Sequence, residues 1–298
     1  MKSVLPAAAL AVAIPCSLAG CVVVDSQGHI AREEKRFAVS GTPELRLTTF
    51  DGSIEIRSGE TKGVVVEIEK RGPTKEAIEQ LTVDSKQDGN SIEVAVRRPQ
   101  HDVEFFGFGR MSSTARLIVT MPRDGHVIAK SGDGSIRIEH VRGRLELRTG
   151  DGSIRATDIG GEMVLATGDG SVTIDNADGD LDVDTGDGSV SVAGKLGIVK
   201  VHTGDGSITF RAEPGTSMKG DWSMTTGDGG VSLYLPSDFG AELDAHTGDG
   251  AIRNELQMAP GSNDGDERAR RTLKGRLGAG GRTLRIRTGD GSVRLKAS

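Results

Sequence analysis

Aromatic side chains are scarce in this sequence: one tryptophan, one tyrosine and seven phenylalanines occur among 298 residues. A core with so few rings must be filled by aliphatic side chains. Glycine, by contrast, is abundant at 43 residues, which favours short strands joined by tight turns. The composition argues against a helical or aromatic-packed fold and predicts an all-β one, in a chain long enough for one large or two small domains.

An excess of positive charge is also missing. The chain has 37 lysines and arginines against 43 aspartates and glutamates, for a formal net charge of −6. A negative chain has no general attraction for a phosphate backbone, so we expect no nucleic-acid partner.

Cysteine occurs only twice, at Cys16 and Cys21, and both lie in the N-terminal segment. There Lys2 precedes the run VLPAAALAVAIPCSLAG, which is too short and too rich in small residues to span a membrane as a stable helix. The run ends in LAGC, which resembles the bacterial lipobox, where a signal peptidase cuts before the cysteine and the thiol receives lipid. We predict a lipoprotein signal peptide at 1–20 and lipidation of Cys21; an ordinary secretory peptide or an uncleaved N-terminal helix is the alternative. Cleavage leaves no possible disulfide, so the exported fold needs another source of stability.

A short acidic turn, GDG, recurs along most of the chain. Its aspartates are 18 residues apart through five successive repeats, and the next three follow after 23, 21 and 41 residues. A fixed period near 20 residues is typical of solenoids, in which every repeat forms one coil of a stack. The aspartates are Asp133, Asp151, Asp169, Asp187, Asp205, Asp228, Asp249 and Asp290.

Each repeat carries two segments in which apolar and polar residues alternate, as in a strand with one buried face. In the unit at 131–148, Ile136 and Ile138 belong to the first segment, and Leu145 and Leu147 belong to the second. The GDG turn joins successive units, and a second turn around Gly143 joins the two strands within a unit. That glycine recurs every 18 residues, at Gly161, Gly179, Gly197 and Gly215.

An antiparallel meander can be drawn from these strands, but the constant period favours a β-solenoid. Identical residues at a fixed offset stack on one another only when each unit is one coil, parallel to the coil before. We predict a flattened solenoid, right-handed by the usual crossover rule, with two short strands per coil and rungs about 4.8 Å apart. Two buried columns should run through it, one with Ile136, Ile154, Val172, Val190 and Ile208, the other with Leu145, Met163, Leu181 and Val199.

One position breaks the pattern. Val141, Ile159 and Ala177 occupy equivalent apolar sites, but the next unit has Lys195 there. We expect Leu196 to fill that site through a one-residue bulge.

The flanking segments are less regular. Residues 21–40 are predicted to be a tether, and residues 41–128, with alternating strands and a helical turn in TKEAIEQLTV, a β-rich cap. A cap is needed because an open solenoid end exposes unpaired strand edges. The solenoid itself is predicted over 129–298, interrupted at 254–282 by a polar, Gly-rich insertion.

We interpret the GDG turn as a structural corner, spelled alike because every coil needs the same bend. Its glycines, such as Gly132 and Gly134, are expected to adopt backbone conformations that β-branched residues resist. The aspartate is expected to accept hydrogen bonds from amides of its own turn. The threonines before the turns, from Thr149 to Thr288, are expected to form a ladder of hydroxyls.

Two chemical alternatives apply to the aspartates. The first alternative is a calcium site, because like charges about 4.8 Å apart repel by roughly 1 kcal/mol in water and a cation would offset that repulsion. The nonapeptide spacing of calcium-binding solenoids is absent, however, so we predict no metal and no cofactor. Glycoside hydrolysis is the other, but it needs two carboxylates in different environments, whereas the repeated aspartates are equivalent. His202 and His246 each precede a TGDG turn, two coils apart, and form no metal pattern.

Two segments outside the repeat are candidate interaction sites. FFGFG places Phe105, Phe106 and Phe108 beside glycine, as in a hairpin tip that contacts a membrane or partner, or that folds back over the end of the solenoid. A basic cluster that includes Arg268, Arg270 and Arg271 follows an acidic run. It is either a solvated loop or a contact for anionic glycans or lipid headgroups.

The lipobox, the strand TARLIVTMP, the register SGDGSIRIEHVRGRLELRTGDGSI and the closing GRLGAGGRTLRIRTGDGSVRL together resemble the bacterial putative-adhesin family of β-strand-repeat proteins of unknown function. The resemblance covers roughly residues 40–298. It implies an extracytoplasmic β-solenoid and suggests binding, and it supplies no catalytic or ligand residues.

We therefore expect a non-enzymatic cell-envelope lipoprotein, an adhesin or scaffold, held to the membrane by its lipid and binding an envelope polymer, a glycan or a protein. Val22 after the lipidated cysteine gives no Asp retention signal of the kind seen in some diderm lipoproteins, which favours the outer membrane. The alternative is a carbohydrate-active enzyme, a lyase or hydrolase. A cleft with carboxylates converging from different coils would indicate the latter.

Overall fold

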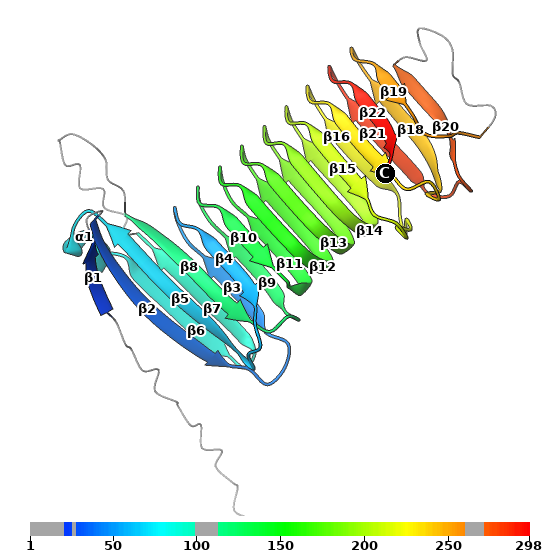
Figure 1. The fold of residues 1–298 in the computed structure, drawn as a ribbon. Helices are drawn as coiled ribbons and strands as arrows, with labels where there is room; N and C mark the ends of the chain where they lie inside the picture. The colour runs from blue at the N-terminus through cyan, green and yellow to red at the C-terminus, as the bar shows by residue number, and fades with distance from the viewer. Residues whose placement is uncertain (1–20, 26–27, 99–112, 260–270) are drawn as a thin grey trace, which may run out of the picture.

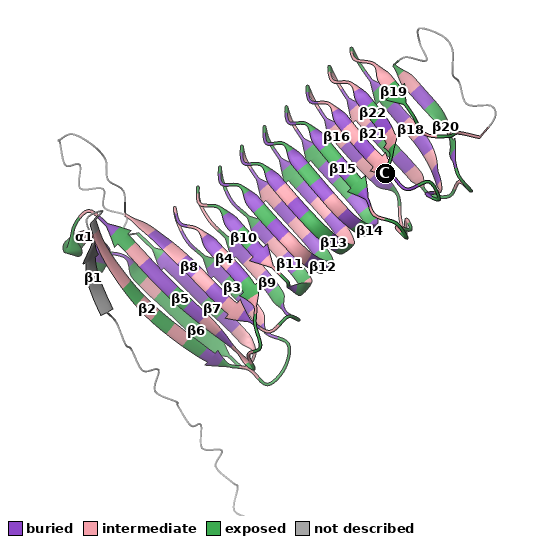
Figure 2. Ribbon diagram, viewed as in Figure 1, coloured by how far each residue is buried: buried purple, intermediate pink, exposed green. Residues whose placement is uncertain are grey.

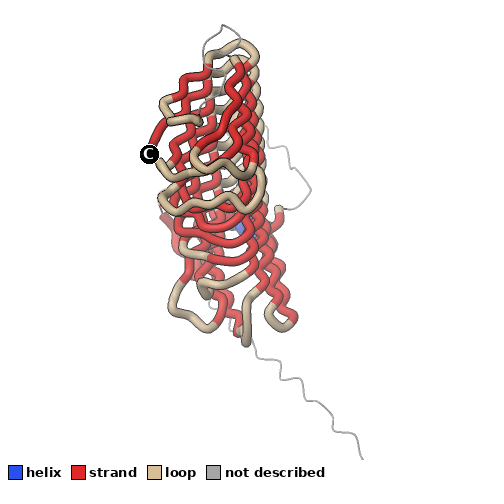
Figure 3. The backbone as a smooth tube through the Cα atoms, turned by 90° about the vertical axis from the view of Figure 1, so that its right-hand side faces the viewer, coloured by secondary structure: helices blue, strands red, loops and turns tan. Residues whose placement is uncertain are grey.

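The computed structural model describes residues 21–25, 28–98, 113–259 and 271–298, with side chains from His29 onward. Strands make up most of this part of the chain, which includes one short helix, α1 (Lys75–Glu79). The all-β class is thus confirmed. The strands lie side by side along an elongated molecule, and a view from the side shows the coils following one another as a stack (Figure 1, Figure 3). No helix in the described ranges has the length and hydropathy needed to cross a bilayer.

Each coil contributes one strand to each of two rows, and the GDG corner joins them. We name the row that leads into the corner face A and the row that leaves it face B. Neighbours within a face are hydrogen-bonded. In spatial order, face A consists of β6 (Thr82–Asp88), β7 (Ser91–Arg97), β3 (Glu44–Thr48), β9 (His126–Lys130), β11 (Arg142–Arg148), the second halves of β12 (Ile154–Thr167), β13 (Val172–Thr185) and β14 (Val190–Thr203), then β16 (Trp222–Thr226), β21 (Thr283–Thr288), β18 (Ala241–Thr247) and β20 (Thr272–Leu277).

Face B is built from the partner strand of each coil and from extra strands at the N-terminal end. In spatial order it consists of β1 (Cys21–Asp25), β2 (Gly28–Ala38), β5 (Gly63–Gly72), β8 (Thr114–Met121), β4 (Ile54–Ser58), β10 (Ile136–Glu139), the first halves of β12, β13 and β14, then β15 (Ile208–Ala212), β17 (Val231–Leu235), β22 (Val293–Ala297) and β19 (Ile252–Asn254).

The register of the regular coils agrees with the sequence. Ile136 pairs in parallel with Ile154, and the pairing continues through Val172 and Val190 to Ile208, each no more than 1% exposed. Leu145, Met163, Leu181 and Val199 form the second buried column in the same way. Parallel pairing excludes a meander for these strands. Buried and exposed residues alternate along them, so one largely aliphatic core runs between the two faces (Figure 2).

The irregular unit contains a bulge, though not quite the expected one. The offset between β13 and β14 changes between Ile174 and Ala177, and it changes back after Gly179. Lys195 is exposed and Leu196 is buried, as predicted. Leu196, however, lies opposite Gly179, and Gly194 lies opposite Ala177. The small Gly194 fits because the backbone of the preceding coil approaches closely there, with the Ala177 carbonyl oxygen 2.2 Å from where a Cβ would lie.

The segment expected to be a tether is part of the sheet. Strand β2 pairs antiparallel with β5 over its whole length, and β1 pairs antiparallel with β2. This pairing satisfies the backbone groups along the outer edge of β5, and Phe37 of β2 is buried. The predicted helical turn is α1, whose N-cap residue Thr74 accepts a hydrogen bond from the Ala77 amide.

At both ends, the order of coils in space differs from their order in the chain. The first coil, β3 with β4, lies between the coil of β7 and β8 and the coil of β9 and β10. The last coil, β21 with β22, lies between the coil of β16 and β17 and the coil of β18 and β19. Part of the expected 254–282 insertion is β20, which pairs antiparallel with β18; residues 260–270 lie outside the described ranges.

Candidate functional site

The GDG corners form a continuous edge of the stack. All eight predicted aspartates are exposed there. Their order in space departs from the sequence at the C-terminal end, because Asp290 lies between Asp228 and Asp249: the Gly289 amide donates to the Gly227 carbonyl at 2.7 Å, and the Asp249 amide donates to the Gly289 carbonyl at 2.8 Å. The edge is therefore one uninterrupted ladder of carboxylates.

Threonine, rather than aspartate, fastens every GDG corner except the first, where Ser131 takes its place. The Thr203 hydroxyl lies 3.2 Å from the Gly186 carbonyl and 3.0 Å from the Gly188 carbonyl of the preceding coil, and it accepts a hydrogen bond from the Gly206 amide of its own turn. The expected aspartate-to-own-turn bond is not found at the corners of the described coils. The hydroxyls bond to backbone instead of forming a chain with one another. The same bonds to a neighbouring coil are made by Thr149, Thr167, Thr185, Thr226, Thr247 and Thr288.

The corner glycines are required for close approach and not for unusual dihedral angles. Gly170 has no positive φ, but a Cβ on it would lie 2.1 Å from the Gly152 carbonyl oxygen of the preceding coil. The expectation of special backbone conformations is wrong here. It holds at the second turn, where Gly143, Gly161 and Gly179 have φ of 138°, 103° and 138°.

Arginines pair with the carboxylates at the two ends of the ladder. Asp51, which sequence reasoning missed, begins it: a Cβ on Gly134 would meet the Gly52 carbonyl, so the turn at 51–53 stacks on the first GDG corner. Arg98 Nη2 lies 2.8 Å from Asp51 Oδ2, and Arg271 Nη2 lies 3.1 Å from Asp249 Oδ1 at the other end. The sequence does indicate that this turn is equivalent to a GDG corner, because FDGSIEI has the same pattern as GDGSIRI.

The ladder is suited to a structural role in water. Its carboxylates are solvated, which reduces their mutual repulsion to about 1 kcal/mol per neighbouring pair. Within the described ranges, no group of three or more His, Cys, Asp or Glu side chains is arranged to hold a metal ion.

The second turn has its own polar ladder. His140, Asp158 and Asn176 occupy equivalent positions with φ of 60°, 51° and 56°, a left-handed conformation that these short polar residues tolerate. His140 Nδ1 lies 2.8 Å from Asp158 Oδ2, and Asn176 Nδ2 donates to Asp158 Oδ1 at 3.0 Å. The hydrogen bond from His140, together with the charge of Arg123, holds the pKa of Asp158 below its usual value. The carboxylate therefore stays charged and joins three coils.

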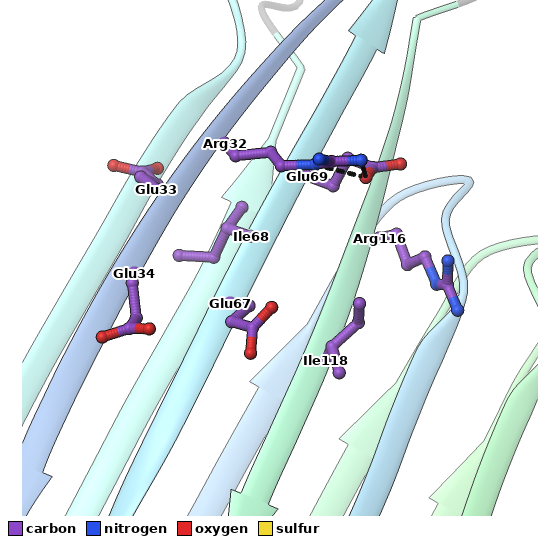
Figure 4. A pocket seen from close by; sticks show the side chains of 8 residues that line it. All are labelled: Arg32, Glu33, Glu34, Glu67, Ile68, Glu69, Arg116 and Ile118. Atoms are coloured by element: carbon purple, nitrogen blue, oxygen red, sulfur yellow. Dashed lines mark hydrogen bonds and ion pairs between the residues drawn. The ribbon is translucent and has the colours of Figure 1, made fainter. Parts of the chain in front are cut away.

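A shallow pocket of about 370 Å³ opens on face B near its N-terminal end. Figure 4 shows Arg32 and Glu69 joined by an ion pair of 2.8 Å across β2 and β5, with Arg116 of β8 beside them. Glu34 and Glu67 lie in the next cross-strand row. The pocket is thus a depression between two rows of charged side chains on a flat sheet.

The carboxylates that line the pocket are not arranged to provide the general acid of a glycosidase. Burial raises the pKa of Glu69, but hydrogen bonds and attraction from Arg71 and Arg32 outweigh it and leave the pKa below its usual value. A general acid needs a raised pKa so that it holds its proton near neutral pH. Glu69 therefore serves to hold the two arginines, and Arg116 is itself paired with Glu55 at 2.7 Å.

The remaining candidates are scattered. Phe105, Phe106, Phe108, Arg268 and Arg270 lie outside the described residues. His202 and His246 are exposed and lie three coils apart, not two, because the inserted strand β21 adds Arg287 between Thr225 and His246.

A family model described as Toastrack DUF4097 matches residues 42–296. Among curated proteins none is significantly similar to this chain. Similar solved structures include a putative adhesin from Bacteroides fragilis, with 12% identity, a TM-score of 0.43 and coverage of 90% of this chain and 97% of that one. A putative lipid binding protein from Parabacteroides distasonis has 10% identity, a TM-score of 0.42 and coverage of 89% and 96%. A putative cell adhesion protein from Clostridium sporogenes has 13% identity, a TM-score of 0.29 and coverage of 90% and 99%.

Proposed function

This chain belongs to the family described as Toastrack DUF4097, and we propose that it is a non-enzymatic protein of the cell envelope, an adhesin or scaffold with a rigid, repetitive surface. The coils form a right-handed β-solenoid, and the strands at its N-terminal end cap it. The long faces of that solenoid are the binding surface.

The observation that supports this proposal is the way each corner is fixed to the next. The Gly168 amide donates to the Gly150 carbonyl at 2.5 Å, and the Thr167 hydroxyl lies 2.8 Å from the Gly152 carbonyl. These bonds continue the strand pairing through the bend, where a solenoid would otherwise be free to flex. Outward side chains are then held at the strand spacing of about 4.8 Å along the stack, as a multivalent contact with a polymer requires.

The protein is held to the membrane by lipid on Cys21 and lies on the outer membrane where the cell has one. Strand β1 begins at Cys21 and lies on the outer edge of face B. The lipid therefore places the membrane at the N-terminal end of the stack. Several acyl chains are needed for stable attachment, since a single chain binds only weakly and reversibly.

Cys21→Ala tests the anchor. The variant should move from the membrane fraction to the soluble fraction, while Cys16→Ala, in the segment expected to be removed, should leave the protein on the membrane. A Cys21→Ala protein that stays membrane-bound would show that the lipobox interpretation is wrong.

Binding of the protein to an array of envelope polymers and host glycans tests the function, with release of reducing sugar measured on the same array. We expect saturable retention of at least one polymer and no release of sugar. Release that disappears in Glu69→Gln would instead favour the carbohydrate-active enzyme.

A further inference from the structure

Charge is segregated along the stack. Residues 157–240 contain four lysines and arginines against fourteen aspartates and glutamates, whereas residues 113–156 contain eight against five. A strongly acidic middle section thus adjoins a basic one. Because the coils stack in chain order here, the division appears directly on the surface.

The two charges meet on face A across a single strand. The basic band, Arg142, Arg144 and Arg148, projects from β11, and the acidic band, Asp178, Asp180, Asp182 and Asp184, projects from β13. Between them, β12 has Gly160, Val164 and Ala166, which are small or apolar, and Glu162, whose Oε1 lies 3.6 Å from Arg144 Nη2 of the same chain. β11, β12 and β13 are neighbours in the middle of the stack (Figure 1).

The two bands stand at matched levels. The parallel register gives four cross-strand rows, which are Arg142–Gly160–Asp178, Arg144–Glu162–Asp180, Glu146–Val164–Asp182 and Arg148–Ala166–Asp184. Consider a second copy related to the first by a two-fold axis that runs along β12 in the plane of the contact. This axis places each β11 residue of one copy over the β13 residue of the same row in the other copy. Three of the four rows then oppose an arginine to an aspartate, twice over, since the contact is isologous.

The fourth row is like-charged but already balanced within each chain. Arg148 Nε lies 2.8 Å from Glu146 Oε1, and Lys200 Nζ lies 3.4 Å from Asp182 Oδ2. Asp178 and Asp184, by contrast, are exposed and make no ion pair within the described ranges. They are the carboxylates available to an arginine from outside.

An exposed apolar side chain borders the acidic band. Ile198 on β14 is 43% exposed, and its amide donates to Asp180 Oδ1 at 3.0 Å. It is the one large hydrophobic residue on the exposed surface of the described chain. Covering it adds an apolar contribution to an otherwise polar contact.

We propose that face A, centred on β12, is the contact surface of a symmetric homodimer in which the basic band of one copy binds the acidic band of the other. Five strands of seven residues cover a patch of about 24 by 23 Å, or about 1,100 Å² counted on both copies. That is the low end of specific interfaces, so the dimer is weak, and its charge pairing makes it sensitive to salt.

Charge reversal on each band, followed by mixing, tests the proposal. One variant carries Arg142→Glu with Arg148→Glu, and the other carries Asp178→Arg with Asp184→Arg. Each alone opposes like charges in two rows, so its dimer dissociation constant should rise at least about tenfold. In an equimolar mixture the reversed bands are complementary again, and a heterodimer should form with roughly the wild-type affinity.

Sedimentation equilibrium of the purified protein measures these constants at about 0.01 M and about 1 M salt, where the Debye length is about 30 Å and 3 Å. The matched control is Arg137→Glu with Arg155→Glu, which reverses two exposed arginines of the same coils on face B. It should dimerise like the wild type, and circular dichroism confirms that all variants are folded. A wild-type protein that stays monomeric at low salt, or two reversed variants that do not recover in the mixture, would overturn the proposal.

Discussion

The middle of the stack and its two ends are built from the same coils but connected differently. From β11 to β15 each coil lies beside the ones that precede and follow it in the chain. At the ends the first and last coils are each held between two others, and the outer coil comes from a more internal segment. Antiparallel strands that follow no repeat, β5, β6 and β20, complete these ends.

The difference concerns the stability of the chain termini. Terminal segments usually fray because they pair on one side only. Here the last coil pairs on both sides, and Arg287 joins it to β18 through the Asp244 carboxylate at 2.7 Å. The middle needs only contacts between successive coils, whereas each end depends on contacts between segments distant in sequence, which are slower to form.

Removing one coil from each region should give the largest contrast. Deleting residues 155–172 takes out one 18-residue period and leaves the register intact, so we expect a shorter protein that still unfolds cooperatively. Deleting residues 281–298 removes as many residues but opens a gap between β16 and β18. That variant should lose most of a stability that is typically about 5–15 kcal/mol. Urea unfolding followed by circular dichroism measures both, and a milder effect of the C-terminal deletion would refute the inserted-coil argument.

Gly170→Ala should strongly destabilise the middle of the stack. The new Cβ would lie 2.1 Å from the Gly152 carbonyl oxygen, and backbone on both sides prevents relief, so we expect a loss of about 3 kcal/mol. Gly89→Ala at the N-terminal end is the matched control. Gly89 has φ of 57° but open space around it, so only the dihedral penalty of about 1 kcal/mol applies. Equal losses of stability in the two variants would mean that the corner glycines are not needed for the close approach of neighbouring backbones.

Asp244→Asn should remove a pH-dependent contribution to the stability of the C-terminal end. Burial raises the pKa of Asp244, but the hydrogen bond and charge of Arg287, with Lys274 and Arg285, leave it below the usual value. A lowered folded-state pKa stabilises the protein above about pH 4, and that contribution disappears as the pH falls through the lowered value. The variant should therefore be about 1–2 kcal/mol less stable at pH 7, and the difference should shrink below pH 4. Thermal unfolding across this range measures it; a difference that grows on acidification would contradict the assignment.

Asp169→Asn, in the middle, should change stability by less than about 0.5 kcal/mol, because the carboxylate is exposed and Thr167 makes the corner bonds. Loss of one of a row of like charges can even raise the melting temperature slightly. A chelator should leave the melting temperature of the wild type unchanged. A fall of several degrees with chelator would instead establish a bound cation.

Local patterns predicted the middle well. The 18-residue period and the alternation of Ile136 and Ile138 gave the strands, their parallel pairing and the buried columns. Propensity reasoning was less successful at the corner: it assigned the glycines to dihedral strain and the hydrogen bonds to aspartate. The short distance between the backbones of adjacent coils determines both the need for glycine and the hydrogen-bond partners. That distance cannot be read from the sequence of a single repeat.

Of the candidate surfaces, too, one could be predicted from local sequence patterns and another could not. Eight of the corner aspartates could be located by counting, but Asp51 was overlooked because its turn lies some 80 residues before the corner on which it stacks. The matched bands of β11 and β13 became visible only with the register, which places Arg142 and Asp178 in one row.

What the sequence determined by itself is the coil: its length, its two strands, its aliphatic interior and its acidic corner, because these depend on residues within one period. What only the tertiary structure decided is the order of the coils at the ends. The corners at Gly227, Gly248 and Gly289 are spelled so alike that each can stack on any other. The choice among them is made by contacts outside the repeat, such as Arg287 with Asp244 and β20 against β18, which fix the last coil between two earlier ones.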